Sequence, residues 1–539
     1  MSHIKVQKLI YNEDGSIKSG SASIVDSVYG SFGKYHSKPV TREKLGKVLY
    51  LSADKRSGIF ASPSRGLVEY NAITDTFTEI DNDDPRLPAG IQSPQTEVHT
   101  VFGDVYLMLK FLGKTGFISV LHTAFSETKY FERLLCHLLH TILRDGSKIS
   151  CDNFILKSFA SYLLSDVKIT TLKTDSPYFS FMGQDHTRLA FFKAYVEYMR
   201  KCNPTFGSAC YVDSTPLPND IENNPFNAFS SHGLGGGAVM SRLVLILDKS
   251  TGLPLWYDVI CGNNVDLNTI SFVKEDVAAS LNIKIDSLVL DAGYVSKELI
   301  DAHHIGSETT FIGRMPARKG YPYKTLYWQV KDLIHRAKYD FKRNSHTYFG
   351  YRKEVTIFKQ QEYAYVYVDK YNALKGYSEY RDKHEAEFEK LLDREKDWLA
   401  VESGYFILLS NIEGTPAQIL TEYFCRSRIE TLFKTSKDYI HLLPISKWTA
   451  ERVLGKILND IISTIILVNF RKEMCNSSRS TSEIFAKGES LMCVKKDNGK
   501  IAIERPNKQL KEYYELMGIE IPTHLDLKDF IKDTLGVKL

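Results

Sequence analysis

The stretch SACYVDST, residues 208–215, is a short apolar run that ends in Asp213. A second run of the same form, SLVLDAGYVS, occupies residues 287–296 and carries Asp291 after its apolar part. Short apolar runs of this length are typical of buried strands. Two adjacent strands that each end in Asp bring both carboxylates to one edge of a sheet, where sites in α/β proteins usually lie. We therefore expect Asp213 and Asp291 to lie close together.

The segments around these two runs predict an α/β fold. RLVLILDKSTGLPLWYDVIC, residues 242–261, is typical of two strands joined by a turn at 249–252. DLNTISFVKEDVAASL, residues 266–281, has apolar residues at helical spacing and Asp266 as a candidate N-cap. TTFIGRMP, residues 309–316, is a further strand. The predicted order is strand, hairpin, helix, strand, strand.

A later helix, predicted over residues 416–440, adds a third carboxylate. Thr415 is its candidate N-cap, and Pro416 stands at the first helical position. At about 100° per residue, four polar side chains fall within an arc of about 60°: Tyr423, Arg426, Glu430 and Lys437. Taken alone, this edge is typical of a solvated helix face with a Glu–Arg pair. The two strand aspartates favour a functional interpretation.

Three carboxylates at one site predict a metal centre. Asp213, Asp291 and Glu430 would repel one another and raise one another's pKa unless cations were present. Ligation by oxygen alone suits Mg²⁺ or Mn²⁺ rather than zinc. A pair of such ions can act on a phosphodiester. We therefore predict that these three residues are catalytic and hold two ions, while Arg426 and Lys437 hold DNA phosphates.

Composition narrows the class of protein. The chain has 539 residues, a net charge of +4 and eight cysteines without a Cys-x-x-Cys pair. This argues against a zinc module and a disulfide framework, and it favours a reducing compartment. The N-terminal MSHIKVQKLIYNEDG lacks the apolar core of a signal peptide. The apolar segment 453–470 contains Lys456, Asn459 and Asp460, so we expect a buried core helix and no membrane span.

Local composition suggests the division into regions. Residues 1–60 hold ten Lys/Arg against five Asp/Glu, and residues 314–384 hold sixteen against seven, with sixteen aromatic residues. Such a basic, aromatic segment suits a surface for nucleic acid. The predicted regions are a β-rich candidate for DNA binding (1–100), a helical region (101–203), the first part of the α/β core (204–315), a basic aromatic insertion (316–404), the second part of the core (405–470) and a C-terminal candidate for dimerisation (471–539).

These residues resemble a known enzyme family. Asp213, Asp291 and Glu430, in this order and on this scaffold, resemble the ribonuclease H-like core of DDE transposases. The spacing Y-x2-R-x3-E-x6-K of the late helix matches the YREK signature of cut-and-paste bacterial insertion-sequence transposases. Three further motifs occur in family order: DST (213–215), TGLPLWYDVICGNNVDLNTI (251–270) and LVLDAGYVS (288–296). The long separation between Asp291 and Glu430 implies a mostly β insertion.

The resemblance implies an activity and its partners. It implies a transposase that binds terminal inverted repeats as a homodimer in a synaptic complex. The enzyme would excise the element by way of a hairpin intermediate and join it to target DNA, in the bacterial cytoplasm at the nucleoid. Tyr423 is then a DNA contact beside Arg426 and Lys437, and Trp328 is a candidate for stacking on a flipped base. One departure is SSHGLGGGAVMSR (230–242), which is glycine-rich where the family often has a basic motif.

Two other interpretations remain open. Another ribonuclease H-like nuclease would share the core, but the YREK edge and the long insertion disfavour it. A domesticated DNA-binding protein would keep the fold without turnover, but three mutually repelling carboxylates would then have no use.

Overall fold

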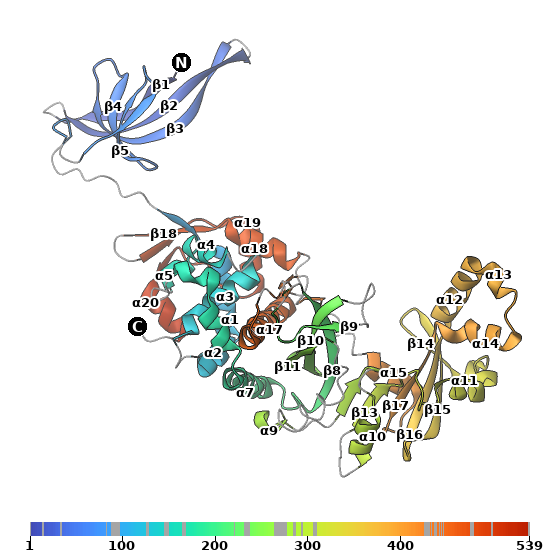
Figure 1. Cartoon of the computed structure of the whole chain (residues 1–539). Helices are drawn as coiled ribbons and strands as arrows, with labels where there is room; N and C mark the ends of the chain where they lie inside the picture. The colour runs from blue at the N-terminus through green and yellow to red at the C-terminus, as the bar shows by residue number, and fades with distance from the viewer. Residues whose placement is uncertain are drawn as a thin grey trace. The chain divides into compact units, whose positions relative to one another are not determined.

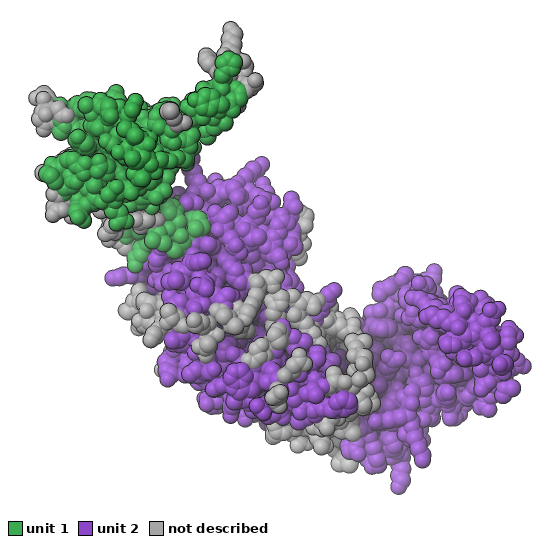
Figure 2. Space-filling view, turned by 45° about the horizontal axis from the view of Figure 1, so that its top comes forward, with its two compact units in different colours: residues 1–100, 492–503 green, residues 101–491, 504–539 purple. Residues whose placement is uncertain are grey.

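The computed structural model describes most of the chain. The described residues are 2–12, 16–32, 35–81, 84–87, 98–125, 129–144, 150–163, 169–219, 221, 223–230, 238–262, 278–283, 287–292, 295–304, 310–424, 432, 434–435, 439–440, 442–443, 445, 447–474, 479–496 and 500–536. They form two compact units, coloured separately in Figure 2. The first contains residues 1–100 and 492–503, and the second contains residues 101–491 and 504–539.

The first unit is built on a six-stranded antiparallel meander in which each strand pairs with the next. Its strands are β1 (Ser2–Tyr11), β2 (Ile17–Phe32), β3 (Tyr35–Leu51), β4 (Ser57–Ser62), β5 (Gly66–Asn71) and β6 (Thr76–Glu79). Ile24, Phe60 and Tyr70 lie at the centre of its main apolar cluster. The unit also contains the hairpin of β18 (Met492–Lys495) and β19 (Lys500–Ile503).

The second unit begins with helices. They are α1 (Gly103–Lys114), α2 (Phe117–Phe125), α3 (Phe131–Leu143), α4 (Cys151–Leu156), α5 (Ala160–Leu163), α6 (Ser176–Met182) and α7 (Asp185–Cys202). The C-terminal part adds α17 (Ala450–Glu473), α18 (Thr481–Glu489), α19 (Lys508–Leu516) and α20 (Leu527–Phe530).

Helix α17 is the core helix that the sequence predicts. Within the described part of the chain it alone is long and apolar enough to cross a membrane, yet 83% of its most apolar window is buried inside the protein. Its buried charges are paired, since Lys456 Nζ lies 2.7 Å from Asp460 Oδ2. It packs closely on α6 at Gly455, where a Cβ atom would stand 1.9 Å from the Phe179 carbonyl oxygen. Only a residue without a side chain fits this contact.

A mixed sheet positions the site. Its strands are β8 (Ala209–Pro218), β10 (Ala238–Asp248), β11 (Pro254–Cys261), β12 (Ser287–Leu290) and β13 (Thr310–Arg314), in the spatial order β11-β10-β8-β12-β13. The strand β9 (Ala228–Ser230) pairs with β10. β10 is antiparallel to β8 and β11, whereas β12 is parallel to β8 and β13. The predicted hairpin and following strands are confirmed, and a helix that was not predicted, α10 (Lys297–His304), lies between β12 and β13 in the chain. Of the predicted helix over 266–281, the described part is α9 (Ala278–Leu281), and Asp266 lies outside the described residues.

The insertion between the two parts of the core continues this sheet. β17 (Tyr405–Ser410) pairs with β13 on one side and with β16 (Gln360–Asp369) on the other, followed by β15 (His346–Ile357) and β14 (Asp340–Arg343). Figure 1 shows the helices gathered at one end of these strands. They are α11 (Tyr323–Val330), α12 (Lys370–Lys383), α13 (Glu385–Phe388) and α14 (Asp393–Glu402).

The insertion is therefore mixed, and the expectation of a mostly β insertion is wrong. The charged segment after β16 is rich in Glu, Lys and Arg, which favour helix. Asp369 also caps α12, because its carboxylate accepts hydrogen bonds from the backbone N–H groups of Tyr371 at 3.1 Å and Asn372 at 3.2 Å. Local propensity and a good cap start a helix directly after the strand.

Candidate active site

Asp213 lies on β8, one residue beyond the last pair that β8 forms with its parallel neighbour β12. The pairing of β8 with β12 runs to Val212↔Leu290, whereas the pairing with β10 runs on to Pro218↔Met240. The expectation that the first strand ends at Asp213 is therefore wrong, since its long antiparallel partner extends it to Pro218. Asp213 is only 7% exposed, and its Oδ1 accepts a hydrogen bond from the Ser214 N–H at 2.9 Å.

Asp291 directly follows β12, and it stands opposite Asp213 at the same height along the two neighbouring strands, a position called their shared level below. Because Val212 pairs with Leu290, the next residue of each strand stands opposite the other. Neighbouring strands lie about 4.8 Å apart, and side chains at one level of a parallel pair point to the same face. The structure therefore brings Asp213 and Asp291 together at one edge, as the two sequence motifs predict.

Arg314 occupies the corresponding position on a third strand, β13. Leu290 pairs with Gly313 in the parallel β12–β13 ladder, so Arg314 stands beside Asp291. Its side chain is exposed, with the guanidinium carbon 5.6 Å from the centre of the Phe406 ring. An exposed arginine beside two carboxylates can hold a phosphate next to them. The sequence analysis missed this residue, although Arg314 follows its apolar run as Asp213 and Asp291 follow theirs.

The helix α15 (Pro416–Phe424) begins on the same face of the sheet. The Tyr367 hydroxyl donates to the Pro416 carbonyl oxygen at 2.8 Å, and Tyr367 pairs in register with Phe406. Arg314 pairs in register with Leu408 of β17. Leu408 and Phe406 are two residues apart on that strand, so their side chains point to the same face of the sheet. The start of the YREK helix thus lies on the face that carries Arg314 and, by register, the two aspartates.

Two polar contacts fix α15 in place. Thr415 is its N-cap as predicted: Thr415 Oγ1 accepts from the Gln418 N–H at 3.3 Å, while Gln418 Oε1 accepts from the Thr415 N–H at 3.1 Å. This reciprocal pair is the capping box arrangement. An ion pair joins Lys249, in the β10–β11 turn, to Glu422 on the helix. The β10–β11 hairpin and α15 are therefore tied together near the start of β8, where the Lys249 N–H donates to the Ala209 carbonyl oxygen.

Tyr423 is buried, with 5% of its surface exposed. The sequence analysis placed it on a free polar edge, and that placement is wrong. The helix turns this residue toward the interior, where its ring lies 6.0 Å from that of Phe424. Arg426, Glu430 and Lys437 lie outside the described residues.

Trp328 is half-buried on α11 among cations and an aromatic ring. The Arg394 guanidinium lies 4.6 Å and the Lys331 ammonium 5.4 Å from the centre of its ring. The Tyr327 ring packs edge-on at 4.8 Å. Arginine and lysine over tryptophan are favourable cation–π contacts, so a base that stacked on this ring would compete with them.

The carboxylate pair fits a hard divalent cation. Asp213 and Asp291 supply only oxygen donors, the type that Mg²⁺ and Mn²⁺ prefer. Within the described ranges, no group of three or more His, Cys, Asp or Glu side chains is placed to hold a metal ion. The third predicted ligand, Glu430, lies outside those ranges. The two strand residues therefore form the described part of the predicted centre.

The chain has similarity to known proteins. Residues 204–459 match the family model described as "Transposase DDE domain", a range that includes Asp213, Asp291 and Glu430. The chain is also similar to a cryo-EM structure of the piggyBac transposase synaptic complex with hairpin DNA, at 12% sequence identity and a TM-score of 0.36, over 72% of this chain and 79% of that one. No curated protein matches the chain. Residues 204–459 of this chain are therefore similar to the transposase DDE domain.

Proposed function

We propose that this chain is a DNA transposase that binds the terminal inverted repeats of an insertion sequence, excises the element and joins it to target DNA. The observation that carries the proposal is the level shared by Asp213 and Asp291 at the edge of the sheet, within a DDE domain. Glu430, from the YREK motif, completes the catalytic set in this proposal. The chain would act in the bacterial cytoplasm, at the nucleoid.

The three carboxylates bind two Mg²⁺ or Mn²⁺ ions in this proposal. Ions bound there would activate a water or a 3′-hydroxyl and stabilise the leaving oxygen of a phosphodiester. Asp213 and Asp291 orient the site, because their strands are fixed in register on both sides of β8. Arg314 holds the phosphate beside them, and Arg426 and Lys437 of the YREK motif add contacts to further phosphates.

The insertion guides the cut end of the DNA. The sixteen Lys/Arg between 314 and 384 suit phosphate binding. Several of the sixteen aromatic residues there are buried, such as Tyr365 and Tyr367, so base stacking falls to those with exposed surface. We include a hairpin intermediate in the proposal, with Trp328 as the candidate that stacks on a flipped base. Residues 1–100 bind DNA, and residues 471–539 contribute to a homodimer that brings two element ends together.

The test is strand cleavage on a duplex that carries the inverted repeat found beside the gene, with its flanking sequence. Wild type should cut with Mg²⁺ or Mn²⁺, whereas Ca²⁺ should support binding only. Asp213→Asn, Asp291→Asn and Glu430→Gln should abolish cutting and keep binding. Asp258→Asn is a matched control, because this carboxylate belongs to β11 of the same sheet but not to the shared level. Cutting that survives a substitution removes that residue from the site.

Two further readouts separate the alternatives. A denaturing gel of the cut ends should show a hairpin, and open ends at every time point would exclude that intermediate. The alternative function is a domesticated ribonuclease H-like DNA-binding protein without turnover. It would bind the duplex with all carboxylates intact and cut with no metal ion, and its gene would lack flanking inverted repeats.

A further inference from the structure

The long strands β2 and β3 form a two-stranded ribbon beyond the rest of their sheet. Strand β1 pairs with β2 only as far as Ser2↔Asp26, and β4 pairs with β3 only from Lys47↔Ala61. We call the remaining segments, residues 27–32 and 35–41, the β2–β3 ribbon. Pairs such as Val28↔Lys38 and Tyr29↔Ser37 hold it together, and Figure 1 shows it projecting from the meander.

The described side chains of the ribbon are mostly exposed, although several are apolar. Tyr29 is 77% exposed, Val28 45% and Val40 44%. A two-stranded hairpin without a packed face is only marginally stable in water. Exposed apolar side chains gathered on such an element mark a surface that binds a partner.

The charge of the ribbon selects the class of partner. Residues 27–41 contain Lys34 and Lys38 and no Asp or Glu. His36 and Lys38 are exposed. Positive charge without acidic side chains favours a polyanion over an acidic or neutral protein surface.

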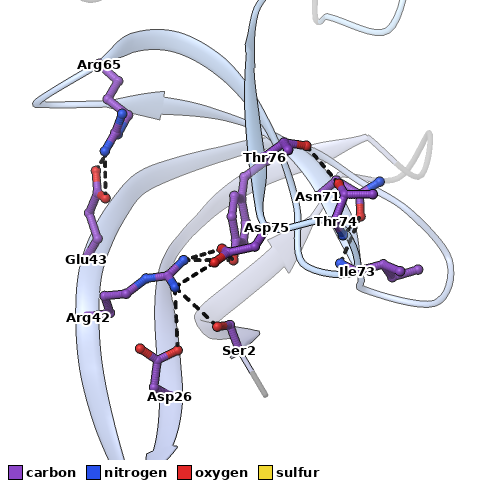
Figure 3. A network of polar contacts seen from close by, with 11 residues as sticks. Ser2, Asp26, Arg42, Glu43, Arg65, Asn71, Ile73, Thr74, Asp75 and Thr76 are labelled. Carbon is purple, nitrogen blue, oxygen red and sulfur yellow. Dashed lines mark hydrogen bonds and ion pairs between the residues drawn. The ribbon is translucent and has the colours of Figure 1, made fainter.

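The root of the ribbon is fixed by a polar network (Figure 3). The Arg42 guanidinium donates to both carboxylate oxygens of Asp75, with Nη1 to Oδ2 at 2.9 Å, and it donates to the Tyr70 hydroxyl at 3.2 Å. The Tyr70 hydroxyl in turn donates to Asp75 Oδ1 at 2.7 Å, and Asp26 Oδ1 lies 3.9 Å from Arg42 Nη1. Arg42 therefore serves the fold. A rooted ribbon loses less conformational entropy when it binds.

The shape of the ribbon fits duplex DNA. The major groove is about 12 Å wide and admits a two-stranded β-ribbon. Alternation along each strand places Val28, Lys38 and Val40 on one face. A lysine can donate to the acceptors of guanine, and valine methyl groups can contact the thymine methyl. We propose that the β2–β3 ribbon enters the major groove of the element's terminal repeat with this face toward the bases. The proposal deepens the function proposed above and rests on it.

The test uses the full chain in metal-free buffer, with two duplexes: the inverted repeat beside the gene and a scrambled sequence of equal composition. Lys38→Ala should weaken binding and reduce the slope of log affinity against log salt by about one unit, because one phosphate-neutralising charge is lost. Lys18→Ala is the matched control, because it removes an exposed lysine at the opposite end of β2 and should leave the slope unchanged. The pair Val28→Ser and Val40→Ser should keep the slope and reduce the preference for the inverted repeat.

Equal slopes for wild type, Lys38→Ala and Lys18→Ala would overturn the proposal. The proposal would also be overturned if ribbon variants changed the sedimenting mass of the DNA-free protein but left DNA binding unchanged. The ribbon would then bind a second copy of the chain and not DNA. Cleavage measured in parallel separates this test from the proposed function. If wild type cuts DNA and Lys38→Ala binds DNA as wild type does, the ribbon proposal is refuted and the transposase proposal stands. If Lys38→Ala binds more weakly but wild type cuts no DNA, the transposase proposal is refuted and the ribbon proposal stands.

Discussion

Asp213 and Asp291 stand at one level of two adjacent parallel strands, one residue beyond the Val212–Leu290 pair. Two carboxylates so placed repel each other until a cation lies between them. Mg²⁺ or Mn²⁺ should therefore raise the melting temperature of the free protein. The gain is about 2.7 kcal/mol at an ion concentration of 100 Kd. Calorimetry should show the gain in wild type and Asp258→Asn and its loss in the double variant Asp213→Asn, Asp291→Asn.

Arg314 should matter for DNA held beside the carboxylates. Replacing it with alanine should weaken metal-free binding of the terminal duplex and lower the salt slope by about one unit. Lys193→Ala serves as the control, because Lys193 is exposed on α7, outside both the site and the insertion. Identical salt slopes for the two variants would place Arg314 outside the DNA path.

The mixed edge of the YREK helix allows a prediction about charge. A carboxylate near DNA repels phosphates in the absence of metal, so Glu430→Gln should leave metal-free binding unchanged or slightly tighter while cutting is lost. Arg426→Ala and Lys437→Ala should each lower the salt slope by about one unit. Slopes equal to wild type would mean that these two cations face solvent away from DNA.

Gly455→Ala should destabilise the second unit. Alanine is a better helix former than glycine by about 1 kcal/mol. However, the new methyl group would stand 1.9 Å from the Phe179 carbonyl oxygen and force α17 away from α6. Overpacking of this kind costs about 1–3 kcal/mol, so the net effect is a loss. Gly113→Ala on α1 is the control: its nearest neighbour is a Thr534 methyl group at 3.4 Å, and denaturant unfolding should show no loss.

The network at the ribbon root predicts acid sensitivity of the first unit. Hydrogen bonds from Arg42 and then from Tyr70 lower the pKa of Asp75 to about 2. Because an unfolded aspartate has a pKa of about 3.9, this contribution to stability is complete above that value and is lost as the pH falls toward 2. Asp75→Asn should flatten the dependence of the unfolding midpoint on pH between 5 and 2, followed by circular dichroism. An unchanged pH profile would show that the ion pair adds no stability.

The sequence predicted the strands of the site well because they are buried on both faces. Continuous apolar runs such as those ending at Val212 and Leu290 have few alternatives to a buried strand. The end of a strand is set by its partner, however, and the length of β10 cannot be read from the residues of β8. Arg314 escaped notice for the same reason, since only the register shows which residue stands beside Asp291.

Packing also decided the points that the sequence analysis missed on the helix and the insertion. Tyr423 is buried because packing sets which side of α15 meets the protein, with the neighbouring Phe424 ring against Phe406 of β17. The basic, aromatic composition of the insertion did not specify strands or helices. There, helix propensity and the Asp369 cap were decisive, and both are local signals: the composition of the charged segment 378–399 by itself predicts a helix.

The place of β17 has a consequence for synthesis on the ribosome. The strand that covers the outer edge of β13 follows it by about 90 residues, and translation proceeds at about 5–20 residues per second. For roughly 5–18 s, β13 therefore has its β12 neighbour but no partner on its other side. An uncovered strand edge recruits other chains. Truncation of this gene within the insertion would thus release a product with a permanently open edge, prone to aggregate rather than to act as a smaller nuclease.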